Sequence, residues 1–61
     1  MIITETQYSG TVAVNVDSIC YIMYNTENDR KASRAAIYFT HTYITTKDSI
    51  EKLNKKIEES K

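Results

Sequence analysis

Apolar and polar residues alternate along much of the first 46 residues, a period of two that is typical of half-buried β-strands. Thr11–Val16 shows the alternation most clearly, because its three valines fall on one face. The pattern predicts five short strands, at Ile2–Tyr8, Thr11–Val16, Ser18–Asn25, Ala35–Thr40 and Tyr43–Thr46. Expected turns at Ser9-Gly10 and His41-Thr42, and a polar, charged loop over Thr26–Ser33, separate these strands. Gly10 is expected to adopt a positive φ, which glycine tolerates without steric strain.

The segment Ser18–Asn25 differs from the other predicted strands because both of its faces are apolar. Alternation places its side chains in two sets, Ile19, Tyr21 and Met23 on one face and Cys20, Ile22 and Tyr24 on the other. One helix covers only one face of a sheet, so a monomer would expose the face of Cys20, Ile22 and Tyr24 or its alternate. Exposed apolar surfaces of this kind mark interfaces. The sequence therefore predicts homo-oligomerisation, either face to face or edge to edge.

Residues 47–60 carry the only helical period in the chain. Ile50, Leu53 and Ile57 recur at the spacing that places them on one helix face. Asp48 stands three residues before Glu51, which resembles a capping box, and Thr46 is the competing N-cap. The expected fold class is thus α+β in a single domain, residues 1–61. It comprises a small antiparallel sheet of four to five short strands (residues 1–46) with one C-terminal helix (residues 47–60) packed on one face.

The charges of the chain balance, since eight Lys and Arg face eight Asp and Glu and the formal net charge is zero. Binding to nucleic acid or to an anionic membrane draws on a surplus of cations, so neither is the expected main task. A chain of 61 residues buries only about 60% of its unfolded surface, which leaves a monomer marginally stable. One cysteine and one histidine can form neither an internal disulfide nor a four-ligand zinc site. Self-association is the remaining source of stability.

The N-terminus and the apolar runs indicate where the protein works. The first five residues contain no basic region, and the longest apolar run, Ile19–Tyr24, has six residues, whereas about twenty are needed to cross a bilayer. A single cysteine fits a reducing compartment. We therefore expect a cytoplasmic protein with no membrane partner.

The sequence contains few residues of the types and spacings that catalysis or metal binding needs. Cys20 and His41 are the only pair of nucleophile and base, but Cys20 lies within an apolar run, where a thiol is usually a small buried hydrophobe. The acidic residues Asp17, Glu27 and Asp29 lack the glycine and the terminal glutamate of a calcium-binding loop. The expectation is a protein with no catalytic residue, no metal site and no cofactor.

Two sets of side chains are candidates for binding. Arg30, Lys31 and Arg34 lie in the predicted loop and could bind a small anionic ligand, or they could simply be solvated. The second set comprises residues expected to act as a stacking or interface surface: Cys20, Ile22, Tyr24 and Tyr38. The five tyrosines of so short a chain could stack bases, anchor an interface or fill the core.

Three segments carry a family resemblance: Val14–Ile19, Ala36–Thr40 and Tyr43–Leu53. Together they resemble the FlbD-like family of small flagellar-operon proteins, with its Asn-x-Asp-x-Ile start, its β-hairpin and its closing helix. The turn Thr40-His41-Thr42 departs from the Asn-Gly-Lys of that family, and the central loop is longer. The same β-β-β-α rhythm is similar to the LytTR DNA-binding domain, which is longer and more basic. The FlbD-like resemblance implies a non-enzymatic accessory protein and supplies no catalytic residue.

Three functions follow as alternatives. The first is a non-enzymatic homo-oligomeric binding or assembly module that docks a protein partner. The second is an oligomer that sequesters a small anionic ligand, such as a nucleotide, between its subunits as very small phage-like proteins do. The third is a nucleic-acid-binding regulator, which the balanced charge disfavours and whose affinity would fall steeply with salt.

Overall fold

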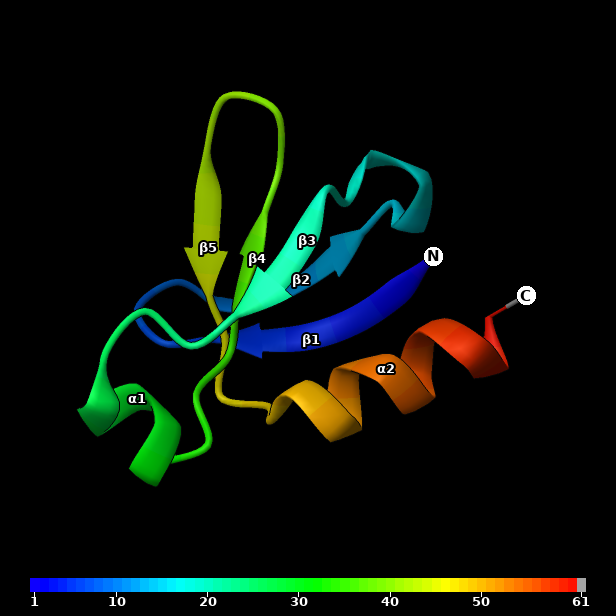
Figure 1. Ribbon diagram of the computed structural model, residues 1–61. Coiled ribbons are helices and arrows are strands. Elements are labelled where there is room, and N and C mark those ends of the chain that lie inside the picture. The colour runs from blue at the N-terminus through cyan, green and yellow to red at the C-terminus, as the bar shows by residue number, and fades with distance from the viewer. Residues whose placement is uncertain (61) are drawn as a thin grey trace.

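Short strands and two helices make up the chain in the computed structural model, which describes residues 1–60 (Figure 1). In chain order, these elements are β1 (Ile2–Thr6), β2 (Gly10–Val14), β3 (Tyr21–Met23), α1 (Glu27–Lys31), β4 (Ala36–Tyr38), β5 (Tyr43–Thr45) and α2 (Ile50–Glu59). A single 3₁₀ turn, Val16–Ser18, lies between β2 and β3. The expected α+β class, with antiparallel strands followed by a C-terminal helix, is confirmed.

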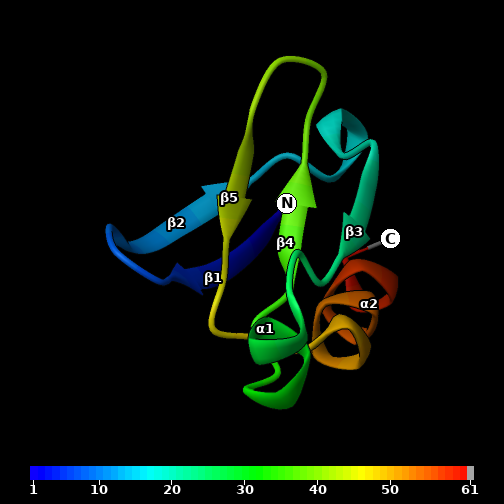
Figure 2. The same ribbon diagram turned by 60° about the vertical axis from the view of Figure 1, so that its left-hand side comes forward.

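The strands are divided between two antiparallel sheets rather than one. β1 and β2 form a hairpin, whereas β3, β4 and β5 form a three-stranded sheet in that order. The two sheets meet at one corner, where an isolated bridge joins Thr6 and Thr46. Two backbone hydrogen bonds of 2.9 Å flank this bridge, from the Gln7 amide to the Thr45 carbonyl and from the Lys47 amide to the Glu5 carbonyl. The corner lets the hairpin cross over the inner face of the larger sheet (Figure 2).

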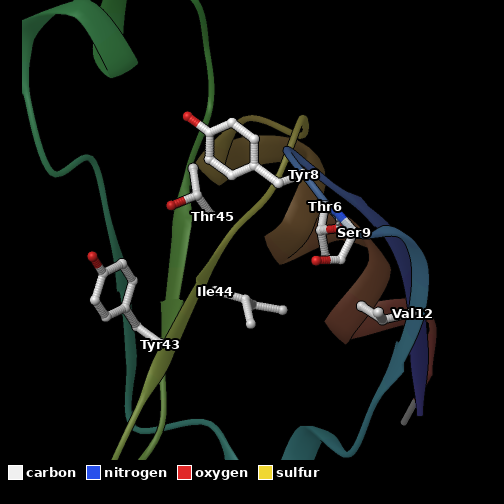
Figure 3. A pocket seen from close by; sticks show the side chains of 7 residues that line it. All are labelled: Thr6, Tyr8, Ser9, Val12, Tyr43, Ile44 and Thr45. Atoms are coloured by element: carbon white, nitrogen blue, oxygen red, sulfur yellow. Dashed lines mark hydrogen bonds between the residues drawn. The ribbon is translucent and has the colours of Figure 1, made fainter.

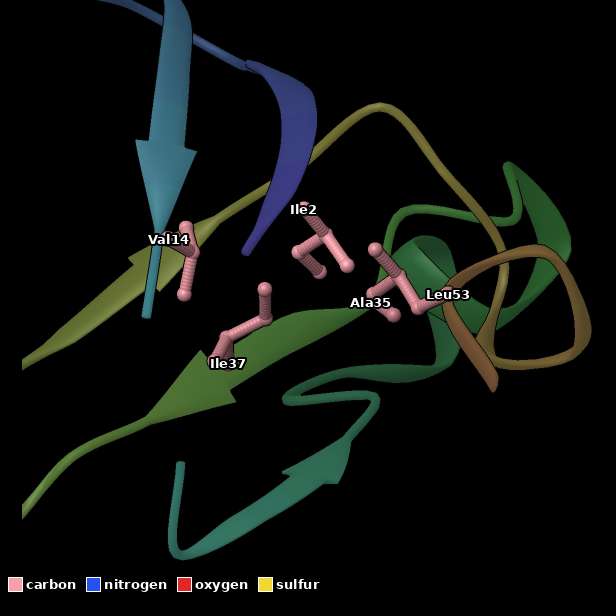
Figure 4. Close-up of a cluster of buried hydrophobic side chains, with 5 residues drawn as sticks. All are labelled: Ile2, Val14, Ala35, Ile37 and Leu53. Carbon is pink, nitrogen blue, oxygen red and sulfur yellow. The ribbon is translucent and has the colours of Figure 1, made fainter. Parts of the chain in front are cut away.

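The hydrophobic core lies between the hairpin, β4 and α2. Its buried members are Ile2, Val14, Ala35, Ile37 and Leu53, which point toward one another from these elements (Figure 4). The turn into β2 has the backbone expected of it, because Gly10 adopts a φ of +77°. Among residues 1–60, no helix is both long enough and apolar enough to cross a membrane.

The segment Thr26–Ser33, expected to be an irregular loop, contains the short helix α1. Thr26 caps this helix, since its hydroxyl accepts a hydrogen bond of 3.0 Å from the Asp29 amide. Acidic residues occupy the first turn and basic residues the last, an order that complements the helix dipole. Ser33, with a φ of +57°, ends the helical segment.

The N-cap of the second helix lies one residue after Asp48 and three residues after Thr46, the two predicted caps. This N-cap is Ser49, whose hydroxyl accepts a hydrogen bond of 3.1 Å from the Lys52 amide. Thr46 and Asp48 are buried instead. The Thr46 hydroxyl bonds to the Ala35 carbonyl at 2.9 Å, and the Asp48 carboxylate accepts a hydrogen bond from Thr4 at 2.8 Å. Both polar side chains are therefore used to join segments that are distant in sequence.

Substituting Ser49 with alanine is expected to lower the free energy of unfolding by about 1 kcal/mol, because the Lys52 amide loses its partner. Urea denaturation followed by circular dichroism measures the change. Lys55→Ala, on the exposed side of the same helix, is the matched control and should change stability by less than about 0.5 kcal/mol. Equal effects of the two substitutions would contradict the assignment of the cap.

Candidate docking surface

The register of the three-stranded sheet aligns three tyrosines in one row across it. Tyr21 pairs with Tyr38, and Tyr38 pairs with Tyr43. Their rings are stacked, with centroids 4.7 Å apart for Tyr21 and Tyr38 and 4.9 Å apart for Tyr38 and Tyr43. We call this row the tyrosine ladder. The distance between neighbouring rings equals the distance between neighbouring strands, so the pairing of the strands itself determines how the rings stack.

A row of isoleucines lies one residue away, on the opposite face of the same sheet. Ile22, Ile37 and Ile44 are aligned by the same register. Because successive side chains of a strand point to opposite faces, the isoleucines pack into the core while the tyrosines face outward. The hairpin and α2 thus cover one face of the sheet and leave the other to the ladder.

The ladder is exposed at both ends and held in the middle. Tyr21 and Tyr43 are 53% and 51% exposed, and Met23 beside them is 39% exposed. Tyr38 lies half-buried between the two other rings, and its hydroxyl donates a hydrogen bond to the side-chain oxygen of Asn25. The result is a pre-arranged aromatic surface whose central ring cannot turn freely.

Two shallow depressions adjoin the ladder, one lined by Tyr43 and the other by all three tyrosines. The first, of about 510 Å³, lies between Tyr43 and the hairpin, where Tyr8 stands over Thr45 and the apolar side chains of Val12 and Ile44 form the floor (Figure 3). The second, of about 500 Å³, lies where β3 and β4 meet the turn that carries His41. Among residues 1–60, no Lys, Arg, Asp or Glu lines either depression. The ladder and these two depressions therefore form an aromatic surface on which, within the described part of the chain, His41 is the one titratable side chain besides the tyrosines and Cys20.

The residues predicted to form a stacking or interface surface are distributed over both faces. Tyr38 lies at the centre of the ladder. Ile22 and Tyr24 belong to the opposite, core-facing set, and the Tyr24 hydroxyl accepts a hydrogen bond of 3.1 Å from the Ile50 amide at the start of α2. Cys20 is exposed immediately before β3. The exposed face is thus the alternate set of β3, which contains Tyr21 and Met23.

The three cations of the predicted anionic-ligand site lie in or just after α1, and two of them already face carboxylates. Arg30 lies 3.6 Å from Glu27, and Arg34 lies 3.2 Å from the Asp29 carboxylate through both its Nε and a terminal nitrogen. Lys31 is exposed on the same helix. Figure 1 shows α1 at the opposite end of the sheet from the β4–β5 turn. Local acids therefore offset much of this positive charge.

Cys20 and His41 line the same depression, but the geometry of a nucleophile and its base is not formed. The thiol of Cys20 has a different neighbour, the Thr40 hydroxyl at 3.9 Å. Within residues 1–60, no hydrogen bond joins the thiol to the imidazole, and no group of three or more His, Cys, Asp and Glu is arranged to hold a metal ion.

Sequence reasoning missed the two outer tyrosines of the ladder, Tyr21 and Tyr43. A signal for them was present in the row of isoleucines. The predicted helix has a narrow aliphatic stripe, which favours an aliphatic face of the sheet as its partner. A register that aligns Ile22 with Ile37 and Ile44 supplies that face, and it places Tyr21, Tyr38 and Tyr43 on the opposite, outer face.

Comparison with known proteins adds no relative, since no protein-family model, no curated protein and no solved structure matches this chain. The resemblance to the FlbD-like family stays a prediction.

Proposed function

We propose that this chain is a small non-enzymatic assembly module that works as a homo-oligomer and docks a protein partner on the tyrosine ladder. The observation that carries the proposal is the stack of Tyr21, Tyr38 and Tyr43 beside two depressions whose lining, among residues 1–60, contains no Lys, Arg, Asp or Glu. Tyrosine and methionine are enriched at the centres of protein interfaces, and charged residues are depleted there.

The rigidity of the ladder favours binding. Association costs free energy when side chains lose freedom at an interface. Here the Tyr38 ring is already held between Tyr21 and Tyr43, and its hydroxyl is bonded to Asn25. Packing of a partner on the ladder therefore costs less side-chain conformational entropy.

The placement of charge favours a protein partner over nucleic acid. Proteins that stack bases combine aromatic side chains with cations that follow the phosphate backbone. The Arg residues of this chain lie in or next to α1, away from the β4–β5 turn, and are paired with Glu27 and Asp29. The same ion pairs weaken the alternative of a sequestered anionic ligand at Arg30, Lys31 and Arg34. A cytoplasmic location is part of the proposal, since the single cysteine, Cys20, is exposed as a free thiol.

A photo-crosslinking residue at position 43, introduced in the cells that make the protein, tests the docking. We expect a discrete adduct with one protein at position 43 and none at position 55, an exposed position on α2. With the captured protein purified, Tyr43→Ser should weaken its binding about tenfold or more, because an anchoring tyrosine of an interface contributes about 2 kcal/mol. Lys55→Ser should leave the affinity unchanged. Identical adducts at positions 43 and 55, or full affinity of Tyr43→Ser, would contradict the proposal.

A further inference from the structure

We infer that two copies of this chain pair through the open edge of β3, so that their three-stranded sheets continue into one six-stranded antiparallel sheet. The inference rests on the proposed function, because the paired chains present one docking surface built from two tyrosine ladders. It identifies the strand that makes the contact, the register and the partner, which is a second copy of this chain.

The first support is the state of the strand edges. Within residues 1–60, β4 is the only strand that pairs with β3, whereas the far side of β5 is contacted at its last residue, where the Gln7 amide bonds to the Thr45 carbonyl beside the Thr6–Thr46 bridge. Proteins usually block an open edge with charge or proline. β3 reads Tyr-Ile-Met and is flanked by Cys20 and Tyr24, so it carries neither.

The second support is the match between side chains that the pairing creates. An antiparallel, two-fold symmetric pairing centred on Ile22 places Ile22 opposite Ile22 of the second copy, and Tyr21 opposite Met23 of the second copy. The isoleucines then meet on the core-facing side. The tyrosine and methionine meet on the outer side, where a thioether and an aromatic ring attract each other.

The outer edge of the hairpin strand β2 is also open and offers less to a second copy. Its outward side chains are the small residues Thr11 and Ala13, so pairing there would add little aromatic or aliphatic contact. At β3, each copy brings Tyr21 and Met23, which are exposed large side chains. The difference selects β3 as the edge that pairs.

The third support is the area that docking requires. A stable protein interface buries about 800 Å² on each partner, which is about a fifth of the 4185 Å² that this chain exposes. An aromatic side chain presents about 150–250 Å², so the half-exposed Tyr21 and Tyr43 together offer only about 200 Å². Two ladders in one continuous sheet double this aromatic area to about 400 Å², and the second copy thus enlarges the docking surface toward the area that an interface requires.

Sedimentation velocity over a range of concentrations tests the pairing. We expect a species of twice 7.0 kDa for the natural sequence. Met23→Lys should raise the dissociation constant of this species at least tenfold, since it buries a charge at the shared edge. Ala13→Lys, on β2, is the matched control and should leave the constant unchanged, and circular dichroism should give folded spectra for both variants. A natural chain that sediments as a monomer at every concentration, or a dimer that Ala13→Lys dissociates and Met23→Lys does not, would overturn the inference.

Disulfide trapping tests the register. In a Cys20→Ser background, Tyr21→Cys and Met23→Cys chains are prepared separately and then mixed under mild oxidation. Facing residues of paired strands have Cα atoms about 4.5–5.5 Å apart, within the range of a disulfide. The expected product is a mixed dimer, formed at least tenfold faster than either homodimer. Equal or faster formation of the Tyr21→Cys homodimer would overturn the register.

The two proposals fail separately. A monomer that still gives the position-43 adduct overturns the β3 pairing and leaves the docking function standing. A dimer trapped in the expected register, but without that adduct, supports the pairing and contradicts docking on the ladder.

Discussion

Replacing Leu53 with alanine is expected to lower the free energy of unfolding by about 3 kcal/mol, the largest effect of any single core truncation on α2. Leu53 is 0% exposed and is the one fully buried side chain of that helix. Its side chain packs beside Ile2 and Ala35, which belong to other segments of the chain (Figure 4). Surroundings of this kind relax only partly when a side chain is truncated, so the substitution leaves a cavity. A domain of this length has a total stability of about 3–9 kcal/mol, so the variant should be partly unfolded at 37 °C.

Two further substitutions separate the cavity from other causes. Leu53→Met keeps the volume and should lower stability by less than about 1.5 kcal/mol. Ile57→Ala truncates a half-buried side chain on the same stripe and should have an intermediate effect of about 1–2 kcal/mol. Urea denaturation at 15 °C gives all three values. A loss for Leu53→Ala no greater than that for Ile57→Ala would mean that α2 is not fixed to the core through Leu53.

The elements that the sequence predicted well are those set by local patterns. The spacing of Ile50, Leu53 and Ile57 predicts a helix with one apolar face, whatever that face packs against. In the structure these three side chains do pack on the core. The alternation of the β segments and the positive φ of Gly10 are likewise properties of a few neighbouring residues. Their prediction needs no knowledge of distant contacts.

The start of α2 was mispredicted because three good N-caps stand close together. Thr46, Asp48 and Ser49 all have side chains that can accept a hydrogen bond from a helix amide. The choice is made by burial, since Thr46 bonds to Ala35 and Asp48 bonds to Thr4, which leaves Ser49 for the helix. Contacts over 11 and 44 residues cannot be read from the local pattern.

The candidate site depended on register, which local alternation leaves open. Shifting a strand by one residue exchanges its faces, so both sets of β3 were acceptable as the exposed one. The register that aligns Ile22 with Ile37 and Ile44 also aligns Tyr21 with Tyr38 and Tyr43. The division into two sheets had no local signal either, because the two sheets meet at a bridge between Thr6 and Thr46, which are far apart in the sequence.

A buried acid joins the N-terminal strand to the C-terminal helix and makes the stability depend on pH. Asp48 accepts hydrogen bonds from the Thr4 hydroxyl at 2.8 Å and from the Lys56 ammonium at 2.6 Å, and Lys52 lies 3.7 Å away. The Lys56 ammonium also bonds to the Ile3 carbonyl at 2.8 Å. Asp48 and Lys56 thus connect α2 to β1 at two adjacent points.

The pKa of Asp48 reflects a competition between burial and its partners. Burial raises the pKa of this carboxyl, but the hydrogen bonds from Lys56 and Thr4 and the positive charges of Lys56 and Lys52 outweigh it. The pKa in the folded protein therefore lies below the ordinary value of 3.8. A lowered folded pKa means that the unfolded chain binds the proton more tightly. The stability that Asp48 contributes is present above pH 3.8 and is lost as the pH falls through the folded pKa.

Asp48→Asn should accordingly lower the free energy of unfolding by about 2 kcal/mol at pH 7, since Lys56 and Thr4 lose a charged acceptor. The difference between the natural chain and this variant should shrink as the pH falls below 3.8. Urea denaturation at pH 7, 5, 3 and 2 measures it. Asp17→Asn, at an exposed carboxylate, is the control and should change stability by less than about 0.5 kcal/mol at pH 7. If the Asp48→Asn difference kept its full size at pH 2, the replacement of an acceptor oxygen by an amide nitrogen and not the loss of charge would be responsible, and the account of Asp48 as an ionised link between β1 and α2 would be wrong.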